Sequence, residues 1–300
     1  MRTILVWSLL CLIWGTTWFF IKIGLDDLPP ISFAAIRFTL ALIILFAFIK
    51  LKKIPLPKKR SEWKILLITG VLQFSFNYSM VFWSEKYISS GLAAVLQATI
   101  PAFGLLMAWI HLPDERITRR KILAIVMGIV GVGIIFVEQL QVKDFWAFIG
   151  CVAIVVGAFA AAEASILTKA QNGAMSPVIL LFCQMLCGIL PIILVAYFKE
   201  GNPLNFHWTK MAIFAVAHLA IVGTIIAFWL YYWLLNRVES SKAMTISLVT
   251  PLVAVIVGGL FLDEKLPVET LFGGILILAG VGLIVAKRKA KPSIGEVEHA

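Results

Sequence analysis

Glu163 is a carboxylate well inside a long apolar segment of this 300-residue sequence, a position that makes any charged side chain a candidate functional group. In a low-dielectric cavity a carboxylate takes up a proton more readily than in water, so Glu163 could shuttle protons. It could instead bind the ammonium group of a substrate. The structural alternative is an ion pair with Lys169 or with another base near the same end of the segment, and the sequence leaves these roles open.

Three basic residues in similar segments favour structural interpretations. Lys22 is followed by Asp26 four residues later, so an ion pair along one helix face is available. Lys169 lies near the end of its segment, where a long side chain can reach water. Arg37 lies about 9 Å deep, at about 1.5 Å per residue. It could reach Asp26 or Asp27, or donate to carbonyl groups of a neighbouring helix.

Neutral polar and aromatic residues recur at helical spacing on several segments, and in lipid such side chains are costly unless they face the protein interior. We expect them, with Glu163, to surround one central cavity that binds the substrate. The candidate residues are Trp14, Thr17, Trp18, Gln73, Asn77, Gln97, Glu163, His218, Trp229, Tyr232, Ser247 and Thr250. Hydrogen bonding between helices is the alternative for each of them. Such a cavity would favour small, partly apolar zwitterions over multiply charged anions.

Two prolines interrupt the apolar segments. Pro101 and Pro251 each free a carbonyl group one turn back and weaken a helix where bending would help gating. Glycine-rich stretches at 128–133 and 280–282 favour close packing of helices. They have no preceding strand, so we reject a dinucleotide-binding loop.

The composition identifies the elements that must position these residues. Apolar residues make up 61% of the chain and charged residues 14%, and the mean hydropathy is +0.98. Soluble domains have about 45–50% apolar residues and about 25% charged residues. The sequence therefore predicts an all-α integral membrane protein of the cell (inner) membrane. The net charge of +10 comes from short basic clusters between apolar segments, which argues against nucleic acid as a partner.

A bilayer core of roughly 30 Å requires about 20 apolar residues per helix, and the chain offers ten such segments. They cover about 4–25, 31–50, 64–84, 88–111, 119–137, 145–168, 176–198, 209–235, 240–262 and 268–286. If the N-terminus is cytoplasmic, 19 Lys and Arg residues fall on the inside and 5 on the outside. The positive-inside rule then predicts ten transmembrane helices with both termini cytoplasmic.

An internal repeat recurs at a spacing near 150 residues. Pro101 matches Pro251, and the tripeptide Asp-Glu-Arg at Asp114 matches Asp-Glu-Lys at Asp263 after a one-residue shift. Each half would hold five helices, and because five is odd the second half enters the membrane from the opposite side. We therefore expect two inverted five-helix repeats around a central cavity. The two units are expected to cover residues 1–143 and 144–300.

The chain opens with four short motifs, Trp14-Gly15, Lys22-x-Gly24, Pro29-Pro30 and Ala35-Ile36-Arg37-Phe38. This opening resembles that of EamA-domain proteins of the drug/metabolite transporter superfamily, and the two proline segments with their Asp-Glu-Arg/Lys and Gly-x-Gly resemble the family's repeat ending. The resemblance covers nearly the whole chain and implies a ten-helix bundle with a cavity open alternately to each side. The second half departs from the pattern, since Gln184 stands where the first half has Arg37.

We therefore expect a secondary-active transporter, an exporter of small metabolites such as amino acids or related amphipathic compounds, working by alternating access. The sequence has no Walker motif, so gradients would drive transport, with protons as a candidate partner. A channel or facilitator is the alternative. An intramembrane enzyme is disfavoured because the sequence has no His-Glu-x-x-His, Gly-x-Ser-x-Gly or paired membrane aspartates.

The expected partners are the lipid bilayer and a small-molecule substrate. No cofactor and no metal is expected, because the four cysteines fall in apolar segments and are typical of small core residues. They are Cys11, Cys151, Cys183 and Cys187.

The predicted topology can be tested with single cysteines in a variant that lacks the four native ones. Lys265→Cys should react with a membrane-impermeant maleimide added outside intact cells, because it falls in a predicted external loop. Arg119→Cys should react only after the membrane is opened. The reverse pattern at either position would contradict the inverted repeat.

Overall fold

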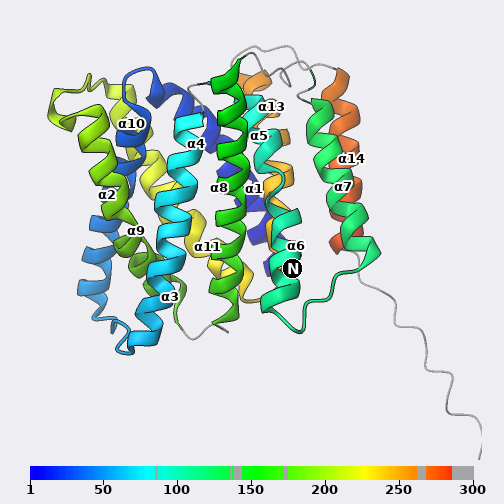
Figure 1. Ribbon diagram of the computed structural model, residues 1–300, viewed down its shortest axis with the longest axis horizontal. Helices are drawn as coiled ribbons and strands as arrows, with labels where there is room; N and C mark the ends of the chain where they lie inside the picture. The colour runs from blue at the N-terminus through cyan, green and yellow to red at the C-terminus, as the bar shows by residue number, and fades with distance from the viewer. Residues whose placement is uncertain are drawn as a thin grey trace, which may run out of the picture.

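The structure is a computed structural model, and it describes residues 1–84, 87–88, 90–135, 137, 144–171, 175–261 and 268–285. Throughout those ranges the regular elements are helices, arranged side by side with their axes roughly along one direction (Figure 1). The second tripeptide of the repeat, at Asp263, lies outside the described residues.

The first half contains α1 (Arg2–Leu25), α2 (Pro30–Lys52), α3 (Arg60–Gly70), the π-helical η1 (Val71–Asn77), α4 (Tyr78–Ser84), α5 (Ser90–Gln97), α6 (Ile100–His111) and α7 (Arg119–Ile135). The second contains α8 (Phe145–Ala170), α9 (Pro177–Glu200), the short η3 (Pro203–Asn205), α10 (Lys210–Ala220), the π-helical η4 (Ile221–Ile226), α11 (Ala227–Leu235), α12 (Ser240–Met244), α13 (Ile246–Phe261) and α14 (Val268–Val285).

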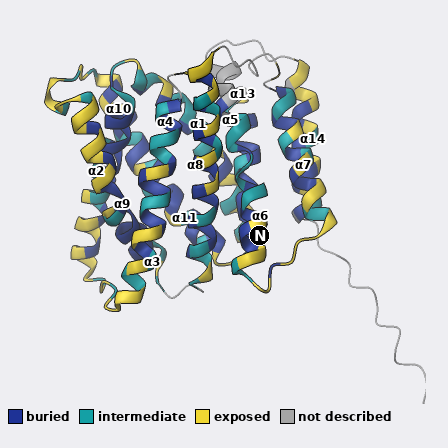
Figure 2. Cartoon of the chain, viewed as in Figure 1, coloured by how far each residue is buried: buried dark blue, intermediate teal, exposed yellow. Residues whose placement is uncertain are grey.

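Six helices in the described part of the chain are long and apolar enough to cross a membrane, counting helices that continue through a π-helical segment as one. They are Arg2–Leu25, Pro30–Lys52, Arg60–Ser84, Phe145–Ala170, Pro177–Glu200 and Lys210–Leu235. Two further apolar helices, Val95–His111 and Leu271–Ile284, are shorter. Many large apolar residues are exposed. Figure 2 shows exposed residues, in yellow, along the lengths of the helices as well as at their ends. A surface of this kind is stable in lipid, so the fold is that of a multi-pass helical membrane protein.

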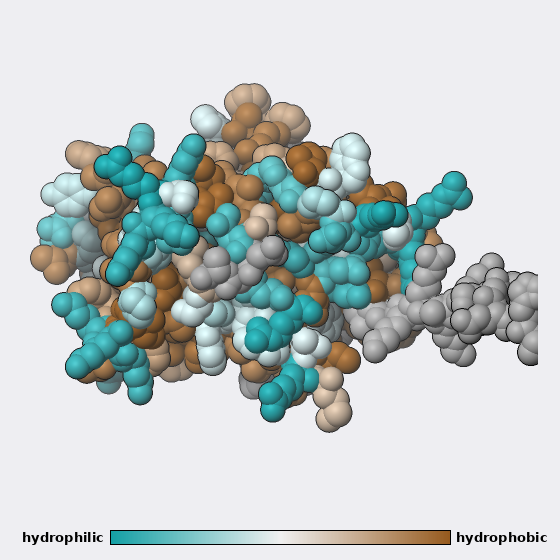
Figure 3. All heavy atoms as spheres, turned by 90° about the horizontal axis from the view of Figure 1, so that it is seen from below, coloured by the Kyte–Doolittle hydropathy of each residue, from teal (hydrophilic) through white to brown (hydrophobic). Residues whose placement is uncertain are grey.

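One end of the bundle is basic. The start of α1, the α2–α3 loop and the α6–α7 loop lie toward this end in Figure 1. Its exposed basic side chains include Lys50, Lys52, Lys53, Lys58, Lys59, Arg60, Arg116 and Arg119. Figure 3 views the molecule from this end and shows hydrophilic side chains gathered between apolar ones. We call it the basic end.

The helices of the two halves pack in interchangeable pairs. α2 packs against α9, and α7 packs against α14. α1 packs against α13 and against α10 and α11, while α8 packs against α5 and α6 and against α3 and α4. Each first-half helix has an equivalent about 150 residues later. Exchanging equivalents leaves α2–α9 and α7–α14 unchanged and turns each pair of α1 into an observed pair of α8. The two π-helical segments follow the same spacing, since they begin at Val71 and Ile221.

α7 and α14 form a separate edge of the bundle, visible at one side of Figure 1. Their backbones touch at glycines: a Cβ atom on Gly131 would lie 2.7 Å from the carbonyl oxygen of Gly273, and one on Gly280 would lie 2.6 Å from that of Ala124. These are backbone contacts that cannot move aside like a flexible side chain. The glycines therefore set the separation of the two helices.

Gly131→Ala should force α7 and α14 apart and destabilise the protein by about 1–3 kcal/mol, the usual effect of overpacking. Gly133 is the matched control, because a Cβ there meets nothing within 4 Å. Gly133→Ala should leave the protein unchanged or stabilise it by up to about 1 kcal/mol through helix propensity. Thermal unfolding in detergent measures both, and equal effects of the two substitutions would refute this packing.

Candidate functional site

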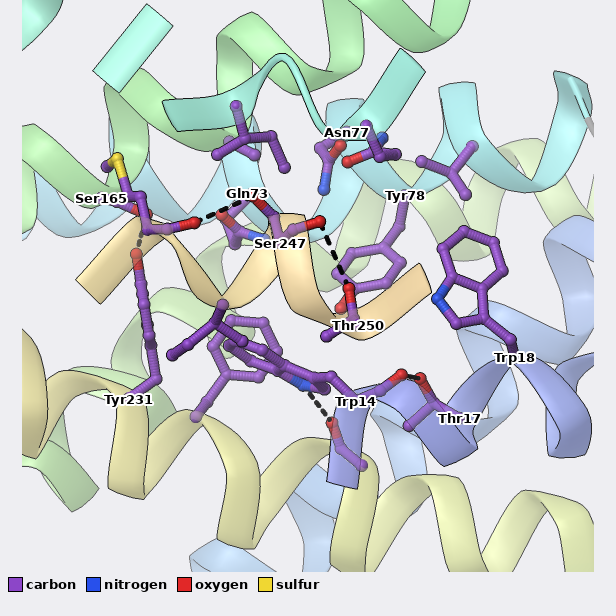
Figure 4. A pocket seen from close by; sticks show the side chains of 18 of the residues that line it. Trp14, Thr17, Trp18, Gln73, Asn77, Tyr78, Ser165, Tyr231, Ser247 and Thr250 are labelled. Atoms are coloured by element: carbon purple, nitrogen blue, oxygen red, sulfur yellow. Dashed lines mark hydrogen bonds between the residues drawn. The ribbon is translucent and has the colours of Figure 1, made fainter. Parts of the chain in front are cut away.

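A cavity of about 170 Å³ lies between helices of the two halves. Eight of the residues expected around a central cavity line it, and these are Trp14, Thr17, Trp18, Gln73, Asn77, Gln97, Ser247 and Thr250. They come from α1, η1, α5 and α13, and Figure 4 shows most of them around one space. Pro251 also lines this cavity, whereas Pro101 begins α6 after a break in the helix and is not part of the lining.

The aromatic wall of the cavity is held by hydrogen bonds and ring contacts. The indole N–H of Trp14 donates to the carbonyl oxygen of Gly223 at 3.3 Å, and its ring lies 5.5 Å from Phe228 and 5.3 Å from Tyr231. The Tyr231 hydroxyl donates to Oγ of Ser165 at 3.1 Å (Figure 4). The wall therefore presents fixed ring faces and edges, which suit an apolar or aromatic group of a ligand.

Two predicted residues of α11 lie outside the cavity. Trp229 is 44% exposed on the outer surface of the bundle, and the Tyr232 hydroxyl donates to Oε1 of Gln184 at 2.5 Å. Helical spacing groups residues on one face but does not fix which face points inward, and a change of one residue turns that face by about 100°. The residues one position earlier, Phe228 and Tyr231, line the cavity instead.

His218 and Glu163 also lie outside the lining of the cavity. The ring of His218 lies against that of Phe20, with 3.8 Å between the centroids and 31° between the ring planes. Glu163 pairs with His111, 3.0 Å away at the end of α6, rather than with Lys169. This pair corresponds to the structural alternative in which a nearby base holds the carboxylate.

Arg37 was expected to anchor α2, and the structure instead places it in the lining of the cavity. One of its expected partners is engaged elsewhere, since Asp27 accepts hydrogen bonds from the Thr209 hydroxyl at 2.5 Å and from His207 at 2.9 Å. The Thr209 bond, followed by the His207 bond, lowers the pKa of Asp27 below its ordinary value. The structural role that the sequence favours for Arg37 stays a prediction, and its place in the lining adds a second candidate role.

A buried carboxylate at the basic end joins three elements. Glu115, 7% exposed in the α6–α7 loop, accepts from the backbone N–H of Ser240 at 2.9 Å and from its hydroxyl group. Its second contact is an ion pair with Lys169 at the end of α8, with 2.7 Å between the charged atoms. Nearby, Lys121 pairs with Glu239 at 3.0 Å. This network ties the α6–α7 loop to α8 and to the start of α12.

The fold and the cavity thus define a multi-pass helical membrane protein with an internal space for a small molecule. A family model, the EamA-like transporter family, matches the chain twice, at residues 1–137 and 148–286. The chain belongs to this family, and its members are membrane transporters.

Relatives support the same class. The chain is 30% identical to "Uncharacterized inner membrane transporter YedA" of Escherichia coli K12, over 96% of this chain and 93% of the relative. It is 24% identical to "Uncharacterized transporter YoaV" of Bacillus subtilis, over 90% of this chain and 92% of the relative. It is 27% identical to a "Probable amino-acid metabolite efflux pump" of Escherichia coli K12, over 91% of each chain. A solved crystal structure shares the fold with a TM-score of 0.79 at 17% identity, covering 95% of this chain and 96% of the other.

Glu115→Gln should destabilise the protein by about 3 kcal/mol, because it removes the charge from a buried carboxylate and leaves the half-buried Lys169 ammonium without its charged partner. Glu239→Gln is the control, since Glu239 is 44% exposed and its pair with Lys121 should contribute about 0–1 kcal/mol. Adding Lys169→Met to Glu115→Gln should restore part of the lost stability, because it removes the unpaired charge. Thermal unfolding of the purified variants measures these differences, and a double variant no more stable than Glu115→Gln would contradict the pairing.

Proposed function

We propose that this protein is a secondary-active exporter that carries small amphipathic metabolites, amino acids among them, through the cavity by alternating access. The observation that carries the proposal is the cavity itself, which has an aromatic wall and a few hydrogen-bonding groups contributed by both halves. The direction of transport and the amino-acid class are supported by the printed name of one relative, a probable amino-acid metabolite efflux pump.

The proposed architecture is ten membrane crossings in two inverted units, 1–143 and 144–300, with both termini in the cytoplasm. The double match to the family model, at 1–137 and 148–286, supports two related units. The interchangeable helix pairs and the spacing of the π-helical segments support the same division. The exposed lysines and arginines of the basic end support a cytoplasmic orientation for that end.

The proposed state of the carrier is closed on the cytoplasmic side. The Glu115 network joins loops and helix ends there, and it would have to open for the substrate to enter from the cytoplasm. The cavity, in contrast, extends toward the other end of the bundle, since its lining includes Trp18 and Ile21 near the end of α1 and Phe82 near the end of α4. Repeats that rock about a fixed site could open each side in turn.

Counterflow in proteoliposomes tests the transport proposal. A panel of amino acids, nucleosides and cationic drugs should reveal saturable uptake that speeds up when unlabelled substrate is loaded inside. Trp14→Ala should lower this uptake at least tenfold, because it removes the centre of the aromatic wall. Trp109→Ala is the matched control, since Trp109 is 64% exposed on the outer surface of α6. Flux that neither saturates nor responds to internal substrate would indicate a channel and refute the carrier.

A further inference from the structure

Arg37 is a buried charge beside Tyr78, and two of its three guanidinium nitrogens have no hydrogen-bond partner among the described residues. Its side chain is 2% exposed, and it lines the cavity. Within the described part of the chain, its Nε and Nη1 atoms have no hydrogen-bond partner. A guanidinium group remains protonated in proteins, so this position holds a positive charge in a low-dielectric space.

The surroundings of Arg37 fix its position without satisfying its donors. The guanidinium carbon lies 4.7 Å from the ring centre of Phe38, 5.0 Å from that of Tyr78 and 6.0 Å from that of Phe82. Ring faces attract a cation but do not accept the paired hydrogen bonds that a guanidinium fork offers. The Nε and Nη1 donors therefore stay available to a ligand.

The carboxylates near the same end of α2 have other partners. Asp27 is engaged by Thr209 and His207. Glu200 accepts from the backbone N–H groups of Ile31 at 3.1 Å and Ser32 at 2.6 Å, at the N-terminus of α2. Among the described residues no carboxylate lies within 4.0 Å of the Arg37 guanidinium nitrogens.

The equivalent position in the second half makes a useful contrast. Gln184, which the repeat aligns with Arg37, donates to the hydroxyls of Thr69 at 2.7 Å and Thr168 at 2.9 Å and accepts from Tyr232 at 2.5 Å. The hydrogen-bonding groups of Gln184 are thus satisfied by residues of neighbouring helices, as expected for a side chain that joins helices. Arg37 lacks such partners at the equivalent position, which points to a partner that enters the cavity.

We propose that Arg37 binds the carboxylate group of the transported substrate, and that the substrates are small monocarboxylates with an apolar side group, α-amino acids included. The carboxylate is the group whose two oxygens match a guanidinium edge in a bidentate pair. A second donor lining the cavity, Nε2 of Gln97, also has no partner in the described residues. The aromatic wall around Trp14 would receive the apolar group. This inference rests on the proposed transport function and specifies its substrate class.

Four probes of matched shape test the substrate class: L-leucine, 4-methylpentanoate, L-leucine methyl ester and 3-methylbutylamine. The first two carry a carboxylate and the last two do not. At millimolar concentrations the first two should raise the unfolding temperature of the wild-type protein and the last two should not. Stabilisation by the amine and the ester as strongly as by the carboxylates, or by neither carboxylate, would overturn the proposal.

Arg37→Met separates binding from a structural role. Without ligand its unfolding temperature should equal or exceed that of the wild type, because a buried, unpartnered charge is removed. Stabilisation by L-leucine and 4-methylpentanoate should be lost, and Arg37→Lys should restore part of it. Gln184→Leu is the control, expected to lower the unfolding temperature while keeping the response to carboxylates. An Arg37→Met protein that is less stable but still responds to carboxylates would assign Arg37 to structure.

Counterflow of the same four probes distinguishes the two proposals. Flux of the amine or the ester that survives in Arg37→Met, together with equal wild-type flux of carboxylates and non-carboxylates, would keep the carrier and reject the carboxylate site. Saturable flux of the carboxylates alone in the wild type, reduced at least tenfold in Arg37→Met, supports both. Absence of saturable flux for every probe and for the wider panel would reject the transport function itself.

Discussion

A polar group inside a bundle covered by lipid has to find its partners within the protein, because hydrocarbon offers no hydrogen bonds. This constraint explains where the polar residues of the chain lie. Gln184 shows it at a helix interface, where two threonines and Tyr232 satisfy the amide group. Glu115 shows it at the basic end, where Lys169 and Ser240 satisfy the carboxylate. In the lining of the cavity, Arg37, Asn77 and Gln97 keep buried polar atoms without a partner among the described residues, which supports the proposal that the cavity binds a polar ligand.

Much of the architecture could be predicted from the sequence. A bilayer requires apolar helices of a minimum length, and both the composition and the segment lengths of the chain meet that requirement. The expectation of an all-helical, multi-pass membrane protein is confirmed by six long apolar helices and by the family match. The candidate residues of α1, η1, α5 and α13 line one cavity, as the spacing of polar and aromatic residues in an apolar chain predicts. Ten crossings and the inverted repeat stay predictions.

The rest of the site could not be predicted, for two physical reasons. Periodicity groups residues that share a helix face, but it does not fix which face points inward. In α11 the lining face holds Phe228 and Tyr231 rather than Trp229 and Tyr232. Contacts between residues far apart in sequence also cannot be predicted from local patterns. Glu163 pairs with His111 on another helix, and Lys169 pairs with Glu115 in a loop of the other half. An isolated charge such as Arg37 gives no sequence signal that separates an anchor from a binding group.

The two halves share a scaffold but differ in the chemistry at matched positions, and this difference bears on the proposed transport cycle. With the cavity empty, the Arg37 charge is buried without a hydrogen-bonding anion. A bound carboxylate would satisfy it and stabilise the loaded carrier. Opening the cytoplasmic side would in turn break the contacts of Glu115 with Lys169 and Ser240. A carrier can change state only if the free energies of its states are similar. The stabilisation gained when a carboxylate binds Arg37 would therefore offset the stabilisation lost when the Glu115 contacts break. The unsatisfied charge would then favour movement of the loaded carrier over movement of the empty one.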